Sequence, residues 1–405
     1  MTIPKQDGAA VSKVTRRSFV GLASAFACNR GTWAMPRQDT DAERLVARVD
    51  RQRVLRDAKA YLQEEPITVT ASHSDRSGGG LHDYFSEGDY WWPDPKSPDG
   101  PYIRRDGFSN PANFDEHRKA LMRLSVQAPT LAAAWKLTRQ RRYAAHFAKH
   151  LRAWFVDETT KMNPNLEYAQ AIHGVTKGRG IGVIDTLQLV EVVRAARVLE
   201  ADGGLSKQDA DAIRAWFSAY VEWMTTSKNG TDEEHEKNNH GTCWVLQVAE
   251  FSQFTYRDDL RTLCITRFKS NIVPLQIAKD GSLPLELART KPYSYSLFDA
   301  DVLAGICQSL STPADNLWLF KGPNGAGVGD VVTFLEPYIS DKSKWPFAKD
   351  VEHFEVMPGR RPCVLFAGVA LHRPEFVREW QQLDASSKDE ELIRNLPIRQ
   401  PLLWV

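Results

Sequence analysis

The chain has 405 residues, of which 42% are hydrophobic and 25% are charged. These shares are close to the average of soluble globular proteins, and they exclude disordered, collagen-like and membrane-bundle classes. Lysine and arginine (52) nearly balance aspartate and glutamate (51), and residues 1–34 hold five of the bases but one of the acids. The rest of the chain is therefore mildly acidic, which argues against general nucleic-acid binding, because such binding needs a basic surface.

The first residues resemble an export signal. Arg16 and Arg17 precede a short apolar stretch, residues 21–28, as in signal peptides of the twin-arginine (Tat) type. This stretch is much shorter than the ~20 residues that a membrane-spanning helix needs. We therefore expect residues 1–34 to be a signal peptide that is cleaved after Ala34, and the mature protein to be periplasmic or secreted without a membrane span. A basic N-terminal tail is the alternative.

Apolar residues recur at helical spacing through most of the chain. One set marks a single apolar helix face: Ile213, Trp216, Phe217, Tyr220, Val221 and Met224. The two glycines at 203–204 and Ser206 predict the start of this helix. Further helices are expected over residues 116–138 (split at Pro129), 147–155, 189–199, 242–254, 258–272, 297–310 and 372–383. Short pieces near 66–71 and 361–367 alternate with the period of a strand.

No linker rich in Pro, Ser or Gly divides the chain. We therefore expect one all-α domain over residues 35–405, built of antiparallel helix hairpins, with long loops at 72–113 and 160–182. The first loop contains three consecutive glycines, several prolines and Tyr90-Trp91-Trp92. Long ordered loops usually carry function, and aromatic residues among turn residues suit a groove that stacks sugar rings. The alternative is that Trp91 and Trp92 cover a helix end.

The cysteines and histidines do not predict a metal site. Four cysteines lie outside the export segment, in apolar sequence and without C-x-x-C spacing: Cys243, Cys264, Cys307 and Cys363. We expect them to be buried, small hydrophobic side chains. His146 and His150 have the i, i+4 spacing of a metal-binding pair, but no third ligand is near in sequence, so a solvated helix face is expected.

Two polar clusters are candidates for catalysis. The first, residues 237–244, places Asn239 and His240 at the start of an apolar helix, where they can face an anion beside the positive end of the helix dipole. An ordinary Asn cap with a surface histidine is the alternative. In the second cluster, Arg289 lies six residues before Tyr295. A tyrosine, with a pKa of ~10, becomes a base only beside cations such as Arg289 and His240. The alternative is that Tyr295 is a core residue.

A third cluster contains one arginine among glycines. Gly178-Arg179-Gly180-Ile181-Gly182 follows Gln170 and His173 in the second long loop. Such a loop suits the presentation of a guanidinium to a carboxylate, in the usual bidentate geometry.

Together these motifs resemble the alginate lyase superfamily of polysaccharide lyases. The resemblance is carried by Asn-Asn-His at 238–240 with Trp244 close behind, Gly-Arg-Gly-Ile-Gly at 178–182, and Arg-Thr-Lys-Pro-Tyr-Ser-Tyr at 289–295. Residues 82–95 and 163–166 (Asn-Pro-Asn-Leu) resemble most closely polysaccharide lyase family 38, whose members cleave alginate and glucuronan. The resemblance covers the mature chain and implies an incomplete α/α toroid, a barrel of antiparallel helix hairpins around a groove.

The resemblance also implies β-elimination at a 4-linked uronate, without a metal or an organic cofactor. Asn239, His240 and Arg289 would neutralise the substrate carboxylate and stabilise the enolate-like charge. Tyr295 would remove the C5 proton, with Tyr293 as the fallback. In mannuronate and glucuronate one tyrosine can serve as base and then as acid, whereas guluronate needs a second base, His240. The implied substrate contacts are Tyr84, Trp91, Trp92, Gln170, His173, Arg179, Asn238, Trp244 and Tyr293.

Two other functions fit the same fold. α/α toroids also host inverting glycoside hydrolases, for which Glu286, Asp299 and Asp301 are the available acids, although nothing in the sequence pairs them. A periplasmic protein that binds an acidic polysaccharide without cleaving it is the second alternative, and the joint presence of the four predicted catalytic residues argues against it. The expected partner is an acidic polysaccharide (polyuronate), with no nucleic acid and no obligate protein partner.

Overall fold

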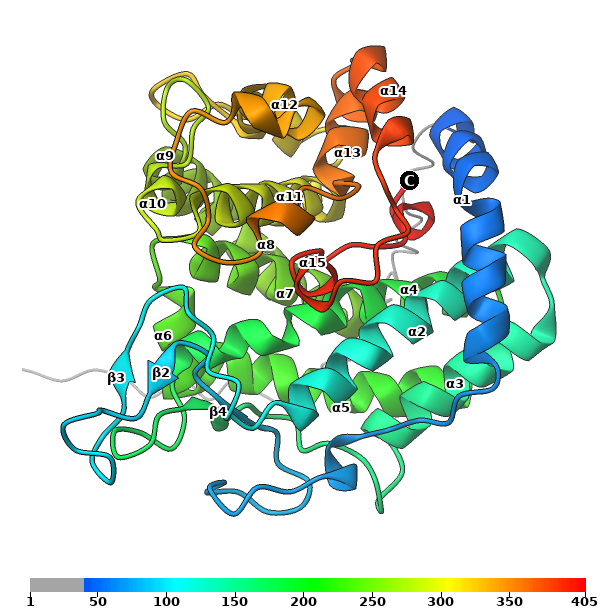
Figure 1. Ribbon diagram of the computed structural model, residues 1–405. Helices are drawn as coiled ribbons and strands as arrows, with labels where there is room; N and C mark the ends of the chain where they lie inside the picture. Colours follow the sequence, from blue (N-terminus) through cyan, green and yellow to red (C-terminus); the bar gives the residue numbers. More distant parts are fainter. Residues whose placement is uncertain (1–39) are drawn as a thin grey trace, which may run out of the picture. The chain divides into compact units, whose positions relative to one another are not determined.

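The computed structural model describes residues 40–405, so the predicted signal peptide and its cleavage point lie outside the described residues. Residues 40–405 belong to one compact unit, and most of this unit is helical (Figure 1). The all-α class that the sequence predicts is therefore confirmed. None of the helices in residues 40–405 is long and apolar enough to cross a membrane.

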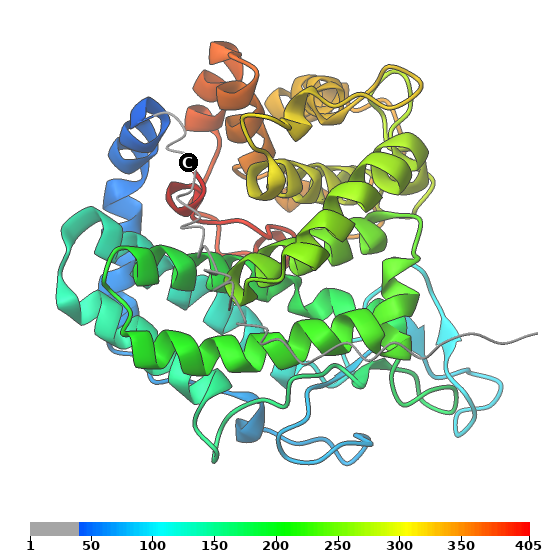
Figure 2. The same ribbon diagram turned by 180° about the vertical axis from the view of Figure 1, so that it is seen from behind.

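Helix pairs build most of the unit. The longer helices are α1 (Thr40–Tyr61), α2 (Glu116–Thr138), α3 (Arg141–Phe155), α4 (Leu189–Ala201), α5 (Lys207–Thr226), α7 (Asn239–Thr255), α8 (Asp258–Arg267), α11 (Pro292–Leu310) and α12 (Val328–Ser340). The shorter ones are α6 (Lys228–Glu234), α9 (Val273–Gln276), α10 (Pro284–Leu287), α13 (Pro362–Ala370), α14 (Pro374–Gln382) and α15 (Glu390–Arg394). Helix α2 packs against α1, α3 and α4, and α7 packs against α4, α5, α8 and α11 (Figure 2). Helices that are consecutive in the chain and helices that are distant in it therefore pack side by side.

The two predicted long loops contain the few strands. β1 (Phe85–Glu87) pairs in parallel with β4 (Tyr168–Ala171), which joins one loop to the other. β2 (Trp91–Trp92) pairs with the antiparallel β3 (Ile103–Arg104) inside the first loop. These short ladders connect the two loops and lie on the side of the molecule where α6 is found (Figure 1).

Helix α5 shows how local sequence produces the packing. Ser206 is its N-cap, as predicted, and the hydroxyl of Ser206 accepts a hydrogen bond from the backbone N–H of Asp209. The apolar stripe predicted from the sequence is buried along the whole helix. The ring of Phe217 lies within 6.0 Å of the rings of its aromatic neighbours Phe155, Trp216, Phe251 and Phe254.

Replacing Phe217 by Ala should lower the free energy of unfolding by about 3–5 kcal/mol, because it leaves a cavity among these rings. Denaturant-induced unfolding followed by circular dichroism measures the change. The neighbouring exposed Ser218, replaced by Ala, is the control, and its effect should stay within about 0.5 kcal/mol. Equal effects of the two substitutions would contradict the packing described for α5.

The expected break of α2 at Pro129 is wrong, because the helix is continuous from Glu116 to Thr138. A proline inside a helix cannot donate to the carbonyl four residues earlier, which here belongs to Ser125. The guanidinium of Arg399 donates to that carbonyl at 3.4 Å and to the Ser125 hydroxyl at 3.1 Å. A distant arginine thus replaces the hydrogen bond that Pro129 removes.

Other helix boundaries also differ from the expectation. Residues 361–367 form no strand: Arg361 is the N-cap of α13 and residues 362–367 belong to this helix, which is buried on every side and so lacks an amphipathic period. Residues 69–71 form a single 3-10 turn. The helix expected over 258–272 ends as α8 at Arg267 and continues as a π-helical turn over 268–272.

The cysteines behave as predicted, but the histidine pair does not. All four described cysteines are buried and free. His150 is 1% exposed, so the expected solvated face is wrong for this residue. Its ring packs edge-on against His146, and burial lowers the pKa of His150 to about 4. Within residues 40–405, no group of three His, Cys, Asp or Glu side chains is arranged to hold a metal ion.

Candidate active site

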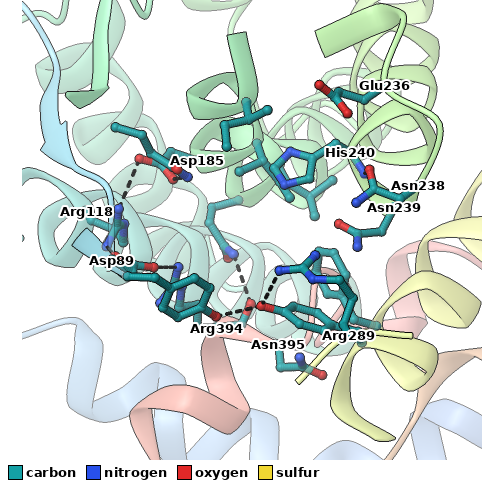
Figure 3. A pocket seen from close by; sticks show the side chains of 18 of the residues that line it. Asp89, Arg118, Asp185, Glu236, Asn238, Asn239, His240, Arg289, Arg394 and Asn395 are labelled. Carbon is teal, nitrogen blue, oxygen red and sulfur yellow. Dashed lines mark hydrogen bonds and ion pairs between the residues drawn. The ribbon is translucent and has the colours of Figure 1, made fainter. Parts of the chain in front are cut away.

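A cavity of about 350 Å³ lies between the strand-bearing loops and the starts of α7 and α11. Figure 3 shows Asn238, Asn239 and His240 on one side of it, and Asp89 and Arg118 on the other. The residues predicted to be catalytic all line this cavity: Asn239, His240, Arg289 and Tyr295. Four of the predicted substrate-binding residues also line it: Trp91, Gln170, Arg179 and Asn238.

Two helices begin at the cavity. Asn238 is the N-cap of α7, and its side-chain carbonyl accepts a hydrogen bond from the backbone N–H of His240. Helix α11 starts at Pro292, earlier than the expected residue 297, because proline suits the first position of a helix. Tyr295 therefore lies in the first turn of α11. Since helix N-termini carry partial positive charge, both starts favour an anion in the cavity.

Tyr295 supplies a phenol to the cavity. Its hydroxyl oxygen lies 2.6 Å from that of Tyr90, and Nη2 of Arg289 donates to it at 3.4 Å. The Arg289 guanidinium also lies over the Tyr295 ring, 4.5 Å from the centroid. Burial raises the pKa of Tyr295, whereas Arg289 and the hydrogen bond from Tyr90 oppose this rise. These two neighbours therefore favour the phenolate that a base requires.

A carboxylate of the first long loop holds the side chain of Arg289 in place. Its Nη2 contacts Oδ1 of Asp106 at 3.2 Å, and the hydroxyl of Thr290 donates to Oδ2 of the same carboxylate at 2.9 Å. Although burial acts in the opposite direction, Arg289 and Thr290 hold the pKa of Asp106 below its usual value. The ion pair thereby ties the loop that follows β3 to the start of α11.

His240 is held by a buried carboxylate. Its Nδ1 lies 2.9 and 3.1 Å from the two oxygens of Glu233, which is fully buried. Burial alone would lower the pKa of His240, but Glu233 raises it above its usual value, and Glu236 and Glu286 add to this effect. The contact with Glu233 leaves Nε2 as the ring nitrogen available to the cavity. A protonated His240 therefore offers an N–H donor to a bound anion.

Replacing Glu233 by Gln should lower the pKa of His240, because it removes the carboxylate that stabilises the imidazolium. In the native enzyme, anion binding by His240 is present below its raised pKa and is lost as the pH rises through that value. The variant should lose this anion binding at a lower pH than the native enzyme does. Its KM should therefore begin to rise at a lower pH, while its circular dichroism spectrum stays unchanged.

Glu234 is the matched control for this substitution. It lies on the same short helix but pairs with Arg267 at 2.9 Å, away from His240. Glu234→Gln should therefore leave the pH profile of KM in place. An identical profile for Glu233→Gln and the native enzyme would show that Glu233 does not control His240.

Asn239 is oriented by a second buried carboxylate. Its backbone N–H and its side-chain NH₂ donate to the two oxygens of Glu286 at 2.8 and 2.7 Å. The three acids that were considered for a glycoside hydrolase are not available in the cavity. Glu286 holds Asn239, Asp299 is fully buried with a strongly raised pKa caused by that burial, and Asp301 pairs with Arg361. None of these three carboxylates lines the cavity.

The opposite side of the cavity contains residues that the sequence analysis missed. Asp89 pairs with both Arg118 of α2 and Arg394 of α15, and Arg118 also contacts Asp185 at 3.5 Å. The phenol of Tyr90, which follows Asp89, reaches Tyr295. The only sequence signal for this group was Asp89-Tyr90 within the 82–95 motif. Arg118 and Arg394 are far apart in the chain and carry no local pattern.

Other predicted substrate contacts do not line the cavity, and these predictions are corrected: Tyr84, Trp92, His173, Trp244 and Tyr293. Tyr84 and Trp244 are fully buried, where the hydroxyl of Tyr84 donates to Asp185 at 3.1 Å. The hydroxyl of Tyr293 donates to the carbonyl of Tyr338 at 2.8 Å, so this tyrosine is committed to the core. The fallback base is therefore not in the cavity.

Trp92 and His173 lie near the cavity but face away from it. Neighbouring residues of a strand point to opposite faces, so Trp91 faces the cavity and Trp92 does not. The indole of Trp92 donates to the carbonyl of Phe108 at 2.9 Å. His173 packs against Tyr102 and lines a separate surface hollow.

Known proteins share this fold. The chain matches the family model described as alginate lyase over residues 68–345. It is similar to the crystal structure of an alginate lyase from Bacteroides ovatus, with 30% sequence identity and a TM-score of 0.77 over 89% of this chain and 97% of that chain. Alginate lyase A1-III from Sphingomonas species A1 has 14% identity and a TM-score of 0.51, covering 87% of this chain and 94% of that chain.

A variant of alginate lyase A1-III complexed with a tetrasaccharide also has the fold, with 14% identity and a TM-score of 0.53 over 91% of this chain and 97% of that chain. A comparison with curated proteins finds no match. The α/α toroid expected from the sequence is confirmed by these structures. From the family match and the 30% identical relative, the chain belongs to the alginate lyase family and is a polysaccharide lyase.

Proposed function

We propose that this lyase cleaves 4-linked polyuronates, either mannuronate-rich alginate or glucuronan, by β-elimination. The observation that carries the proposal is the meeting of Tyr295 and Arg289 with His240 and Asn239 in one cavity, at the starts of two helices. The similar proteins of known structure are alginate lyases, one of them with a bound tetrasaccharide, which supports an acidic polysaccharide as the substrate class.

The first task of the site is to neutralise the substrate carboxylate. The C5 proton of a uronate is weakly acidic while the adjacent carboxylate keeps its negative charge. Arg289 brings a fixed positive charge, and His240, whose pKa is raised by Glu233, brings an N–H donor in its protonated form. Asn239 uses one amide N–H on Glu286 and has a second to donate. Together they stabilise the enolate-like charge as it develops.

The second task is the movement of the proton. The phenolate of Tyr295 takes the proton from C5, and the electron pair of that C–H bond forms the C4=C5 double bond as the C4–O4 bond breaks. The phenol then returns the proton to the leaving O4. One C–O bond is broken and no water is consumed. This syn elimination suits mannuronate and glucuronate, in which H5 and O4 lie on one face of the ring.

A panel of polyuronates tests the proposal. The purified protein should produce 4,5-unsaturated ends, detected by ultraviolet absorbance, from polymannuronate or glucuronan, and more slowly from polyguluronate, in which H5 and O4 lie on opposite faces. New reducing ends without this absorbance would indicate a hydrolase. Binding of all three polymers without any product would indicate a binding protein. Either result would overturn the proposal.

A further inference from the structure

Arg179 lines the catalytic cavity without a carboxylate partner. No ion pair joins it to any Asp or Glu of residues 40–405, whereas the nearby Arg118, Arg289 and Arg394 each have one. Its Nε and Nη2 donate to the backbone carbonyl and the side-chain oxygen of Gln170 at 3.1 and 3.0 Å. Both partners are neutral, so they orient the guanidinium but leave its charge uncompensated.

Arg179 is partly buried, so its guanidinium loses part of its contact with water and gains no carboxylate in exchange, which is costly for a charged group. Burial, together with the charge of Arg104, lowers the pKa of Arg179 to about 10, so the guanidinium is still charged at neutral pH. Asp185 and Asp89, whose charges raise the pKa of Arg179, are paired with other arginines: Asp185 with Arg118, and Asp89 with Arg118 and Arg394. An anion supplied from outside the chain is therefore the missing partner.

The surroundings of Arg179 are built to hold it in place. Gln170 has a φ of +50°, a left-handed conformation that is uncommon outside glycine, and its backbone N–H donates to the Ser86 hydroxyl at 2.9 Å. On the other side, the guanidinium lies 5.8 Å from the centroid of the Trp91 ring. A Cβ at Gly88 would lie 2.9 Å from Nη2 of Arg179 and 2.7 Å from Trp91, so only glycine fits there. Both loops thus shape this position.

Arg179 also marks the place where the cavity continues. A second hollow, of about 500 Å³, shares Arg179, Ile181 and Glu236 with the catalytic cavity. It extends over Gly180 to the side chains of Thr231 and His235. Asp232 also lines the second hollow. The two hollows therefore adjoin at Arg179, where a polymer bound with one sugar at Tyr295 would extend.

We propose that Arg179 binds the carboxylate of the uronate next to the one that loses its proton, so that efficient cleavage requires two adjacent uronates. This inference rests on the proposed function. The planar guanidinium matches a carboxylate with two parallel N–H donors, and the ring of Trp91 beside it offers a face for the sugar. Arg179 is then a specificity residue: it favours a polyuronate over a glycan in which uronates alternate with neutral sugars.

The test combines a substitution with a change in the substrate. The best polyuronate of the panel is compared with the same polymer after half of its carboxylates are reduced to alcohols. Arg179→Gln should raise KM on the unreduced polymer about 10- to 100-fold, the loss of a charged hydrogen-bond pair, with kcat nearly unchanged. Reduction should raise KM of the native enzyme strongly and that of Arg179→Gln only slightly. Reduction removes the same fraction of cleavable sites for both enzymes, so this loss cancels when their changes in KM are compared.

Arg105→Gln is the matched control. Arg105 lies over the Trp92 ring, outside the catalytic cavity, so this variant should respond to reduction as the native enzyme does. Circular dichroism and thermal unfolding show whether each variant is folded. Equal losses for the native enzyme and Arg179→Gln on reduction, or an unchanged KM for Arg179→Gln, would overturn the inference.

A binding measurement separates this inference from the proposed function. Calorimetry on Tyr295→Phe, with and without Arg179→Gln, gives Kd for polyuronate oligomers without turnover. A weaker Kd with Arg179→Gln for the unreduced oligomer, but not for the reduced one, supports the carboxylate subsite whatever the reaction is. If the native enzyme forms no unsaturated ends, the proposed function fails; if the two Kd values are equal, the subsite fails.

Discussion

Replacing Tyr295 by Phe should lower kcat on the preferred polyuronate by about 10²- to 10⁴-fold, the usual contribution of a positioned acid–base group. Phenylalanine keeps the ring beneath the Arg289 guanidinium but lacks the hydroxyl that contacts Tyr90 and Arg289. The oligosaccharide Kd, measured by calorimetry, should change by no more than a few-fold. Initial rates of ultraviolet-absorbing product measure the loss of turnover.

Tyr293→Phe is the control for that substitution. Tyr293 lies two residues away in the same helix, but its hydroxyl bonds to the carbonyl of Tyr338 in the core. The variant should therefore keep its turnover and lose about 1 kcal/mol of stability. Comparable turnover by Tyr295→Phe and Tyr293→Phe would remove Tyr295 from the mechanism.

Replacing Arg289 by Ala should lower kcat/KM by about 10²- to 10³-fold, the range seen when one donor to a developing anion is removed. The same change removes the positive charge that opposes the raised pKa of Tyr295. A base acts only when it is deprotonated, so a higher pKa moves the rise of kcat/KM to higher pH. Rates measured across neutral and alkaline pH should show both the loss and this shift.

Arg289→Lys separates the two effects. Lysine keeps the charge near Tyr295 but not the planar fork toward a carboxylate, so the loss in kcat/KM should remain and the alkaline shift should shrink. If Arg289→Ala left the pH profile in place, the pairing of Arg289 with the phenol would have no role in catalysis.

The four candidate catalytic residues could be predicted to lie in one site because they form two short segments of the sequence. Asn239 and His240 lie together at a recognisable helix start, and Arg289 and Tyr295 lie on either side of Pro292, which begins the next helix. Helical periodicity also predicted α5, and the two glycines before Ser206 predicted its start. Local signals of this kind depend on residues within one or two turns, so they can be read without the tertiary structure.

Other features depend on residues that are distant in the chain. Arg118 and Arg394 come from α2 and α15 and meet only at Asp89, so no local pattern marks either. Likewise, the helix that contains Pro129 is continuous because Arg399 donates a hydrogen bond to the carbonyl that the proline leaves without a partner. Such long-range partners follow from packing and have no local signature.

The direction in which a side chain points could not be predicted from the sequence either. Tyr84, Trp244 and Tyr293 lie in or beside the motifs that carry the resemblance, but each points into the core. A motif shows which segment approaches the site, and neighbouring residues of one segment face different ways. Trp91 and Trp92 show this most simply, since only Trp91 lines the cavity.

Mass spectrometry of the products from one saturated uronate oligomer tests the mechanism most directly. If the phenol of Tyr295 drives elimination, the masses of the two fragments should sum to the mass of the oligomer, because no water enters. The fragment with the new non-reducing end should also absorb in the ultraviolet. Fragments whose masses sum to the oligomer plus one water, without that absorbance, would contradict the account.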